Sequence, residues 1–175
     1  MSLKETERLH EKAGALAHLN AELNALYLEQ DDIYSAYAAH FGLSDTAFWI
    51  LYAVCVSDTV ETQNSLAALF HMPPQSINSA VAALVGRGIL CLRQRAGARS
   101  GKALCLTAAG EDFCSRVIFP FFEIEEQAIG ALGALAERYV ESARRVIAAM
   151  RDGVAAAIGN EKDTNEAEQI SKEEP

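Results

Sequence analysis

The sequence predicts a mainly α-helical fold with one small β-hairpin. Near both ends of the chain, apolar residues recur at spacings of three, four or seven, as they do along one face of a helix. The centre instead carries two short strand-like runs on either side of a glycine-containing loop, which is typical of a hairpin. Half of the 175 residues are hydrophobic and only 4 are proline, so the chain can build a sizeable core from helices.

The N-terminal segment is predicted to form one long helix, or two abutting helices, over residues 4–41. Its apolar residues at helical spacing are Leu9, Leu16, Leu19, Leu23, Leu26, Ile33 and Tyr37. Gly42 suits the position after a helix end, and Ser44 suits the N-cap of a second helix over about 45–57. This second helix is apolar almost all round, so we expect it to be buried.

Two short helices are expected next, over 62–70 and 74–86, with Pro74 in the first turn of the second. The apolar face of the second helix consists of Ile77, Val81, Leu84 and Val85. Its opposite face carries the short polar side chains of Gln75, Ser76, Asn78 and Ser79. Strand-like residues 89–94 and 103–107 then flank a basic loop, 95–102, and Thr107 should cap the following helix.

Helices over 108–129 and about 134–157 are predicted for the C-terminal part, and Pro120 could bend the first of them. The second carries an apolar stripe made of Leu135, Tyr139, Ala143, Val146, Ile147, Met150 and Val154. Residues 159–175 are polar and acidic, and we expect them to be disordered.

The distribution of charge points to a polyanion as partner. All 24 acidic residues lie outside the window from Thr62 to Gly110, which nevertheless contains five basic residues: Arg87, Arg93, Arg95, Arg99 and Lys102. The rest of the chain carries a formal charge of −14, so the net charge is −9. Phosphate repels carboxylates and attracts Lys and Arg, so one basic, carboxylate-free stretch on an acidic protein suits nucleic acid. The alternative is chance sparsity in an Ala-rich segment.

The order of a helix, a tight turn, a polar-faced helix and a basic hairpin describes a winged helix-turn-helix. Three segments carry a more specific resemblance: Leu43-Ser-Asp-Thr-Ala-Phe-Trp-Ile-Leu, Leu66-Ala-Ala-Leu-Phe with the helix that follows it, and Leu104-Cys-Leu-Thr-Ala-Ala-Gly-Glu. Through them, residues 43–113 resemble the MarR family of bacterial transcription regulators. The most specific piece is Leu-Thr-x-x-Gly directly after a basic hairpin. The resemblance implies that helix 74–86 reads the major groove and that the hairpin, called the wing, lies on the flanking backbone.

The DNA-binding residues expected from this arrangement are Gln75, Ser76, Asn78, Ser79, Arg87, Arg93, Arg95, Arg99 and Lys102. Two departures from the family stand out: the wing tip lacks the usual Asp, and the groove face of the helix lacks an Arg. Arg99 is the best candidate for the groove-probing residue. Since Gln and Asn pair well with adenine, we expect an A·T-leaning operator. Solvation of a surface helix is the alternative for each polar residue.

In the resembled family, the first and last helices pair between two subunits. The resemblance therefore implies a homodimer in which residues 1–42 and 111–158 form dimerisation helices on either side of a DNA-binding domain at 43–110. An intrachain helical bundle is the alternative. The expected function is a sequence-specific DNA-binding transcription regulator acting as a repressor. A winged-helix protein-interaction module without DNA binding is the competing function, favoured by the uncharged helix face and the acidic total charge.

The family also implies a small aromatic effector bound where the dimerisation helices meet the DNA-binding domain. The expected lining residues are Tyr37, Phe41, Phe48, Trp49, Tyr52, Phe119 and Phe122, for which a plain aromatic core is the alternative. Cys91 and Cys105 could face each other across the hairpin and act as a redox switch, although cytosolic thiols usually stay reduced.

Other classes of function lack support in the sequence. No Ser-His-Asp arrangement, catalytic carboxylate pair, phosphate-binding glycine loop or metal-ligand spacing is readable, so we expect no enzyme activity, cofactor or metal. There is no apolar run long enough for a bilayer and no signal-peptide pattern at the start. We therefore expect a cytoplasmic protein without a membrane partner.

Overall fold

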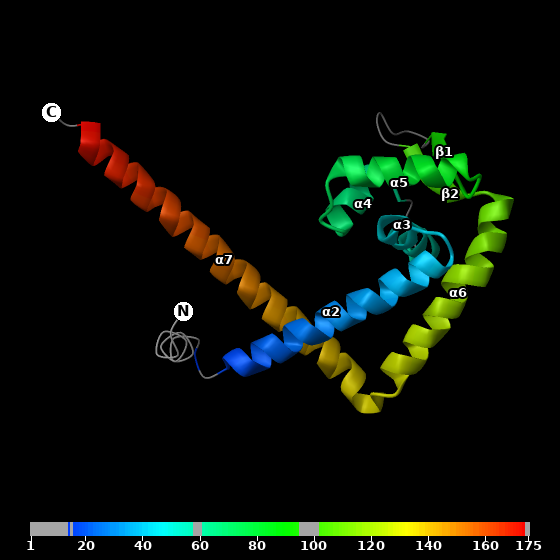
Figure 1. Cartoon of the computed structure of the whole chain (residues 1–175), viewed down its shortest axis with the longest axis horizontal. Helices are drawn as coiled ribbons and strands as arrows, with labels where there is room; N and C mark the ends of the chain where they lie inside the picture. The colour runs from blue at the N-terminus through cyan, green and yellow to red at the C-terminus, as the bar shows by residue number, and fades with distance from the viewer. Residues whose placement is uncertain (1–13, 15, 58–60, 95–101, 174–175) are drawn as a thin grey trace, which may run out of the picture. The chain divides into compact units, whose positions relative to one another are not determined.

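The computed structural model describes residues 14, 16–57, 61–94 and 102–173, which form a mainly helical fold with one two-stranded antiparallel sheet (Figure 1). The elements are α2 (Ala17–His40), α3 (Asp45–Val56), α4 (Gln63–Leu69), α5 (Pro74–Gly86), β1 (Leu90–Gln94), β2 (Lys102–Leu106), α6 (Ala108–Gly130), the 3₁₀ helix η1 (Gly133–Leu135) and α7 (Ala136–Glu173). The chain divides into two compact units after Phe121. The predicted fold class is confirmed.

Helix starts and ends follow local chemistry. Gly42 has a φ of 66°, the left-handed conformation expected directly beyond a helix end. The Ser44 hydroxyl accepts a hydrogen bond from the Ala47 amide at 3.3 Å and so caps α3 as predicted. Thr62 and Ser65 form a capping box at the start of α4. The Thr62 hydroxyl accepts a hydrogen bond from the Ser65 amide, and the Ser65 hydroxyl accepts one from the Thr62 amide.

The first helix is shorter than expected in the part of the chain that the structure describes. Helix α2 begins at Ala17, and Gly14 before it has a φ of 82°, which is not helical. Residues 1–13 and 15, the rest of the predicted helix over 4–41, lie outside the described residues.

Helix α5 packs one face into the first unit and leaves the other in solvent. Its buried residues are Ile77, Ala80, Val81 and Leu84. The prediction that Val85 belongs to this face is wrong, since Val85 is 38% exposed. An α-helix turns about 100° per residue, so Val85 lies about 80° around the helix from Ile77, whereas Ala80 lies about 60° away on the other side. Ala80 therefore takes the place expected for Val85.

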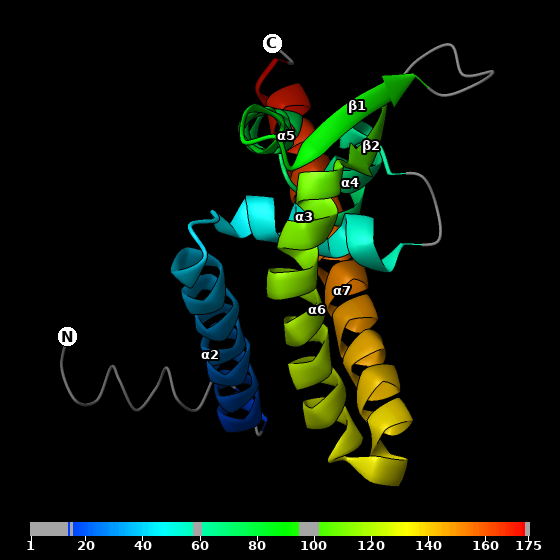
Figure 2. The ribbon, with the colours of Figure 1, turned by 90° about the vertical axis from the view of Figure 1, so that its right-hand side faces the viewer.

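The core of the first unit is built by α3, which is buried on several sides, with α4, α5, the hairpin and the first half of α6. The largest side chains with almost no exposure are Phe48, Ile50, Leu51, Leu66, Ile77, Leu84, Leu90, Ile118, Val81 and Cys114. Figure 2 shows the two strands side by side as antiparallel arrows beside α5. The Leu104 amide of β2 also donates a hydrogen bond to the Glu61 carbonyl at 2.9 Å, which ties β2 to the segment before α4.

Helix α6 matches its predicted range to within one residue, whereas α7 is longer than the sequence suggested. Helix α6 continues through Pro120 as far as Gly130. The prediction of a disordered tail over 159–175 is wrong for most of its length, because α7 continues to Glu173. Low hydrophobicity indicates that a segment is not buried, but it does not prevent helix formation. Residues 160–173 contain no Pro or Gly and include several good helix formers, Ala, Glu, Lys and Gln.

Candidate nucleic-acid interface

The groove face proposed for α5 is open to solvent. Gln75, Ser76, Asn78 and Ser79 are all exposed, while Ile77 and Val81 between them are buried. Pro74 stands at the start of the helix, where its missing N–H removes no helical hydrogen bond. Four short side chains with both donors and acceptors therefore stand on the free side of a helix held by its apolar face.

The turn before α5 is fixed by its backbone. His71 has a φ of 52°, and the Met72 amide donates to the Ala67 carbonyl at 3.1 Å. A left-handed residue closing a helix end sends the chain sharply into the next helix. Pro73, with a ψ of 135°, then leads directly into Pro74, because a residue before proline is held in the extended region.

The hairpin separates its basic residues. The register pairs Arg93 with Ala103 and Gln94 with Lys102. Paired residues share a face and successive residues alternate, so Arg93 and Lys102 point to opposite faces of the hairpin, and both are exposed. Arg95 and Arg99 lie outside the described residues.

Arg87 is held by protein groups that the sequence did not reveal. Its Nη1 donates a hydrogen bond to the Gly42 carbonyl at 2.9 Å, and its guanidinium carbon lies 5.4 Å from the centre of the Phe113 ring. These contacts join the turn after α2 and the start of α6 to the end of α5. Arg87 is thus a positioning residue for this corner of the fold, a role that its basic charge had concealed.

The Leu-Thr-x-x-Gly segment closes the base of the hairpin. The Thr107 amide donates to the Ile89 carbonyl at 3.1 Å, and the Thr107 hydroxyl donates to the Gly88 carbonyl. The same hydroxyl accepts from the Gly110 amide at 3.0 Å, which caps α6. A Cβ atom on Gly110 would lie only 2.0 Å from the Ile89 carbonyl oxygen. The threonine and the glycine are therefore required by the close approach of α6 to the chain before β1.

An aromatic cluster joins α2, α3 and α6 within the first unit. Phe48 is fully buried at its centre, with Tyr34, Tyr37, Trp49, Tyr52 and Phe121 as ring neighbours. The centre of the Tyr37 ring lies 4.5 Å from that of Phe121 and 5.0 Å from that of Phe41, with both pairs of rings tilted. The Tyr37 hydroxyl donates to the Val117 carbonyl at 2.8 Å. Burial raises the pKa of the Tyr37 phenol.

Five of the seven residues expected to line an effector site belong to this cluster: Tyr37, Phe41, Phe48, Trp49 and Tyr52. The predicted lining left out Tyr34 and Phe121, which both belong to the cluster. Phe119 is 45% exposed and Phe122 begins the second unit. Helical spacing could have identified Phe121, because it follows the apolar Val117 by four residues, which is about one helical turn.

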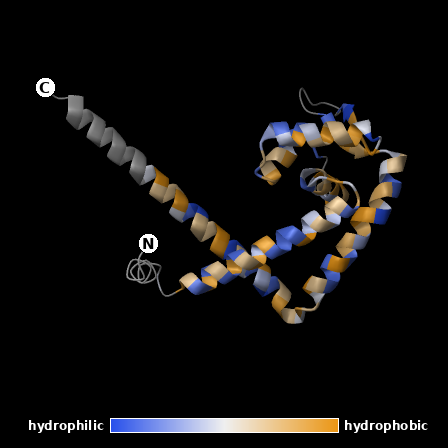
Figure 3. Cartoon of the chain, viewed as in Figure 1, coloured by the Kyte–Doolittle hydropathy of each residue, from blue (hydrophilic) through white to orange (hydrophobic). Residues whose placement is uncertain are grey.

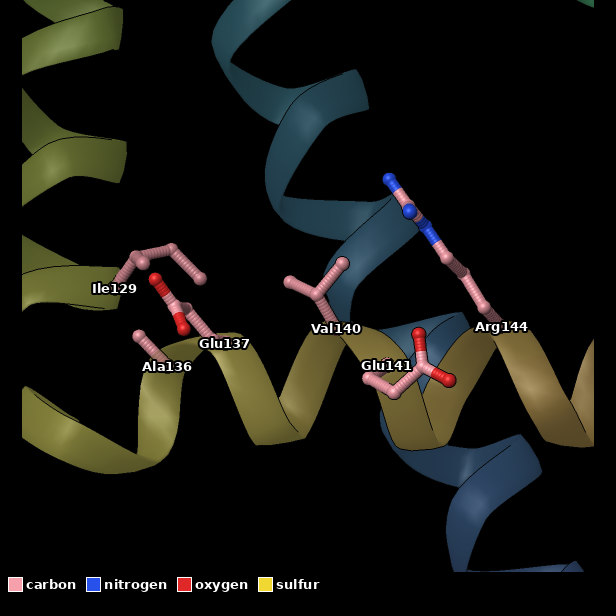
Figure 4. Close-up of a pocket in the computed structure, with 6 residues that line it drawn as sticks. All are labelled: Ile129, Ala136, Glu137, Val140, Glu141 and Arg144. Atoms are coloured by element: carbon pink, nitrogen blue, oxygen red, sulfur yellow. The ribbon is translucent and has the colours of Figure 1, made fainter.

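The second unit carries a cleft between the end of α6 and the start of α7. It has a volume of about 370 Å³ and is lined by Ile129, Ala136, Glu137, Val140, Glu141 and Arg144 (Figure 4). Figure 4 shows Glu137 beside Ile129, with Val140 one turn further along α7. An ion pair of 2.9 Å between Arg145 and Glu141 lies on the same stretch of α7.

Within the described residues, no group of three or more His, Cys, Asp or Glu side chains is placed to hold a metal ion. No single helix of the described chain is both long and apolar enough to cross a membrane; only α2 and α3 taken together, at 91° to each other, have the required length and composition.

No family model matches the sequence, and no curated protein matches it. The fold is nevertheless similar to solved structures. A MarR family regulator from Neisseria meningitidis is 15% identical, with a TM-score of 0.64 over 82% of this chain and 97% of that one. A MepR–DNA complex from S. aureus is 13% identical, with a TM-score of 0.61 over 75% and 97%. The transcriptional regulator BldR from Sulfolobus solfataricus is 14% identical, with a TM-score of 0.59 over 77% and 98%.

Proposed function

We propose that this chain, which has the winged helix-turn-helix fold of MarR-family regulators, is a DNA-binding transcription regulator that acts as a homodimer. The observation that carries the proposal is the pairing of an exposed polar face on α5 with an adjacent basic hairpin in a stretch without any carboxylate. Its fold neighbours include one protein solved with DNA, which supports the same assignment.

Helix α5 is the proposed reader of base edges. Its exposed amides and hydroxyls can each donate and accept hydrogen bonds, and Gln and Asn can bond to adenine through two atoms at once. Because Gln75 and Asn78 carry no charge, they add affinity through base contacts rather than through counterion release. We therefore infer a preference for A·T-rich half-sites.

The hairpin is the proposed source of affinity for the phosphate backbone. Arg93 and Lys102 point to opposite faces of the hairpin. If the hairpin lies against DNA, the two side chains would therefore contact phosphates on either side of it. Arg95 and Arg99 follow in the loop, and Arg99 remains our candidate for the minor groove. The net charge of −9 on the whole chain would keep the rest of the surface away from DNA.

Dimerisation is inferred from apolar side chains that each unit leaves in solvent. On α2 these are Leu19, Leu26, Tyr27, Leu28 and Ile33. On η1 and α7 they are Leu135, Tyr139, Val140, Val146, Ile147, Met150, Val154 and Ile158. Figure 3 shows hydrophobic residues recurring along both helices. So many large apolar residues are rarely left exposed in a monomer, and a second copy is the proposed cover.

We assign the domains accordingly: a DNA-binding domain at 43–110, dimerisation regions at 1–42 and 111–158, and a helical extension over most of 159–175. A regulator of this kind would repress by occupying promoter DNA. We further propose that a small aromatic effector releases it by entering the cluster around Phe48, where rings from α2, α3 and α6 meet.

The test is fluorescence anisotropy with labelled genomic DNA fragments over a series of salt concentrations. The wild type should bind selected fragments far more tightly than bulk DNA, and the affinity should fall steeply as salt rises. Removing Arg93 and Lys102 together should reduce the slope of log affinity against log salt by roughly two ions. Arg116→Ala, an exposed arginine on α6, is the matched control and should leave the slope unchanged.

The absence of binding to every fragment, even at low salt, would instead support the protein-interaction module without DNA binding. An Arg93→Ala, Lys102→Ala double variant that binds like the wild type would remove the hairpin from the interface.

A further inference from the structure

Glu61 stands where three elements of the first unit meet. It is the last carboxylate before the acid-free stretch from Thr62 to Gly110, and it is only 9% exposed. One of its carboxylate oxygens accepts a hydrogen bond of 2.8 Å from the hydroxyl of Ser57, which follows the end of α3. The other oxygen accepts one of 2.6 Å from the hydroxyl of Ser65, in the first turn of α4.

The main chain of Glu61 reaches the hairpin. Its carbonyl accepts a hydrogen bond of 2.9 Å from the Leu104 amide of β2. The register pairs Leu104 with Leu92 and, as the sequence suggested, Cys91 with Cys105. In an antiparallel pair, the amides of alternate residues point away from the partner strand. The Leu104 amide is one of these, so Glu61 holds the edge of β2 that faces away from β1.

The charge of Glu61 fixes the direction of the hydrogen bonds around it. A carboxylate only accepts, so the hydroxyls of Ser57 and Ser65 both have to donate to it. The single hydroxyl hydrogen of Ser65 has two acceptors within reach, Glu61 at 2.6 Å and the Thr62 carbonyl at 2.9 Å, and the nearer, charged one is favoured. The Ser65 oxygen is then oriented to accept from the Thr62 amide at 2.8 Å, so Glu61 orients the capping box of α4.

A buried carboxylate adds little net stability of its own. Removal of a charge from water is unfavourable even when hydrogen bonds replace part of its hydration, and apolar side chains of similar size often stabilise a fold as well or better. The specific contribution of this carboxylate is therefore geometry. Its two oxygens fix Glu61 against the end of α3 and the start of α4, and its carbonyl fixes β2 against both.

We propose that Glu61 is a positioning residue for DNA binding, which holds the hairpin in a fixed relation to α4 and α5 so that hairpin and α5 engage one DNA site together. The inference rests on the proposed function, in which α5 reads base edges and the hairpin contacts the backbone. Helix α4 leads into α5 through the turn at His71, so the orientation of α4 is passed on to the reader. Glu61 is buried, so it acts through these elements and does not touch DNA.

Glu61→Gln is the variant of choice, because it changes the hydrogen-bond chemistry with almost no change in size. The NH₂ group of glutamine donates and cannot accept, so one of the two serine hydroxyls loses its acceptor. Loss of a negative charge also raises the affinity for any DNA by itself. Glu111→Gln, an exposed glutamate of α6 in the same unit, is the matched control for that effect.

The first measurement needs no DNA. Amide hydrogen exchange of the full-length protein, followed by NMR, should be roughly tenfold faster at Leu104 in Glu61→Gln than in the wild type. The Thr107 amide, which donates to the Ile89 carbonyl at 3.1 Å, should exchange at the wild-type rate. A wild-type rate at Leu104 would overturn the proposal, because the carboxylate would then not hold β2. Equal acceleration of both amides would overturn it too, since the change would only have lowered the overall stability.

The second measurement compares DNA affinities by fluorescence anisotropy, well below the thermal midpoint of each variant. The preference for the selected fragment over bulk DNA should fall roughly tenfold in Glu61→Gln, because α5 and the hairpin no longer fit one site at once. The slope of log affinity against log salt on that fragment should fall as well. A smaller folded fraction would lower both affinities equally, so an unchanged preference would overturn the proposal. Glu111→Gln should keep the wild-type preference.

The two measurements separate this inference from the proposed function. A wild type that binds no DNA would overturn the proposed function and with it the role of Glu61 in DNA binding, whereas the exchange rates alone decide whether Glu61 holds the hairpin. If Glu61→Gln does not fold, Ser57→Ala takes its place, because it removes one donor and leaves the capping box intact. It should change the Leu104 exchange rate and the DNA preference in the same directions, and wild-type values for both would overturn the proposal.

Discussion

The Tyr37 hydroxyl of α2 donates a hydrogen bond of 2.8 Å to the carbonyl of Val117, three residues before Pro120 in α6. A proline within a helix removes one backbone hydrogen bond, here the one that the carbonyl of Arg116 would accept. The Tyr37 hydrogen bond ends on the next carbonyl along the chain and joins two helices across 80 residues of sequence.

Tyr37→Phe is expected to lower the free energy of unfolding by about 1 kcal/mol at neutral pH, because the hydrogen bond is lost while the ring remains. The raised pKa adds a pH dependence. The folded phenol keeps its proton above the ordinary value of 10.0, so its contribution is complete below pH 10.0 and is lost as the pH rises through the folded value. Urea titrations from neutral to alkaline pH should show this loss in the wild type and in Tyr139→Phe, the exposed control. If the free energy of unfolding changed with alkaline pH in the same way for the wild type and for Tyr37→Phe, the prediction would be contradicted.

Arg87→Ala should destabilise the first unit by roughly 1–2 kcal/mol, since both the hydrogen bond to Gly42 and the contact with the Phe113 ring are lost. Phe113→Leu, which keeps the charge of Arg87, should lower the thermal midpoint in the same direction and leave the salt dependence of DNA binding unchanged. If Phe113→Leu were fully stable and only Arg87→Ala weakened DNA binding, Arg87 would be a phosphate contact rather than a positioning residue.

Gly110→Ala is expected to cost more than the usual range of about 1–3 kcal/mol for overpacking, because the new methyl group would meet a backbone carbonyl that cannot rotate away. Gly86→Ala is the matched control: no atom lies within 4 Å of its added Cβ, so the change should be neutral or slightly stabilising. Urea unfolding at one fixed protein concentration compares the two. A Gly110→Ala protein as stable as Gly86→Ala would show that α6 can move away from Ile89 at no cost.

Asn78→Ala should weaken binding to the preferred DNA fragment by about 1–3 kcal/mol if its amide makes a two-atom contact with a base. Affinity for bulk DNA should change little. Asn64→Ala, an exposed asparagine on α4, serves as the control and should have no effect on either. An equal loss on both kinds of DNA would make Asn78 a backbone contact, and base reading would then rest on Gln75 and the two serines.

The double change Val146→Asp, Met150→Asp tests the dimer. In an isolated chain these side chains are 39% and 60% exposed, so charges there should be harmless. In a dimer that covers them, unpaired carboxylates would be buried and the subunits should separate or unfold. Ala148→Asp, on the opposite side of α7, should leave assembly intact. Sedimentation showing a wild-type monomer at micromolar concentration would contradict the assembly.

The sequence was sufficient wherever the deciding partners are near neighbours. Ser44, Thr107 and Pro74 mark helix starts through atoms at most three residues away, so their roles could be predicted. Contacts across the fold were missed: Arg87 reaches Gly42 over 45 residues, and Phe48 meets Phe121 only once α3 and α6 have packed. The polar, acidic composition of residues 159–175 led us to expect disorder there. Composition indicates whether a segment is buried more directly than it indicates whether the segment is helical.

The hydrogen bonds that close the base of the hairpin have a consequence for how this protein could diversify. The hairpin is held at its base, through Ile89 to Thr107 and Glu61 to Leu104, and these bonds involve main-chain atoms except for the threonine hydroxyl. These bonds join residues 61, 88, 89, 104 and 107, which all lie outside the stretch between Gln94 and Lys102. We therefore expect that the number and charge of the residues in that stretch can be changed, by mutation or by grafting another loop, without breaking these bonds. A set of such loop grafts on one unchanged scaffold would vary DNA preference independently of folding.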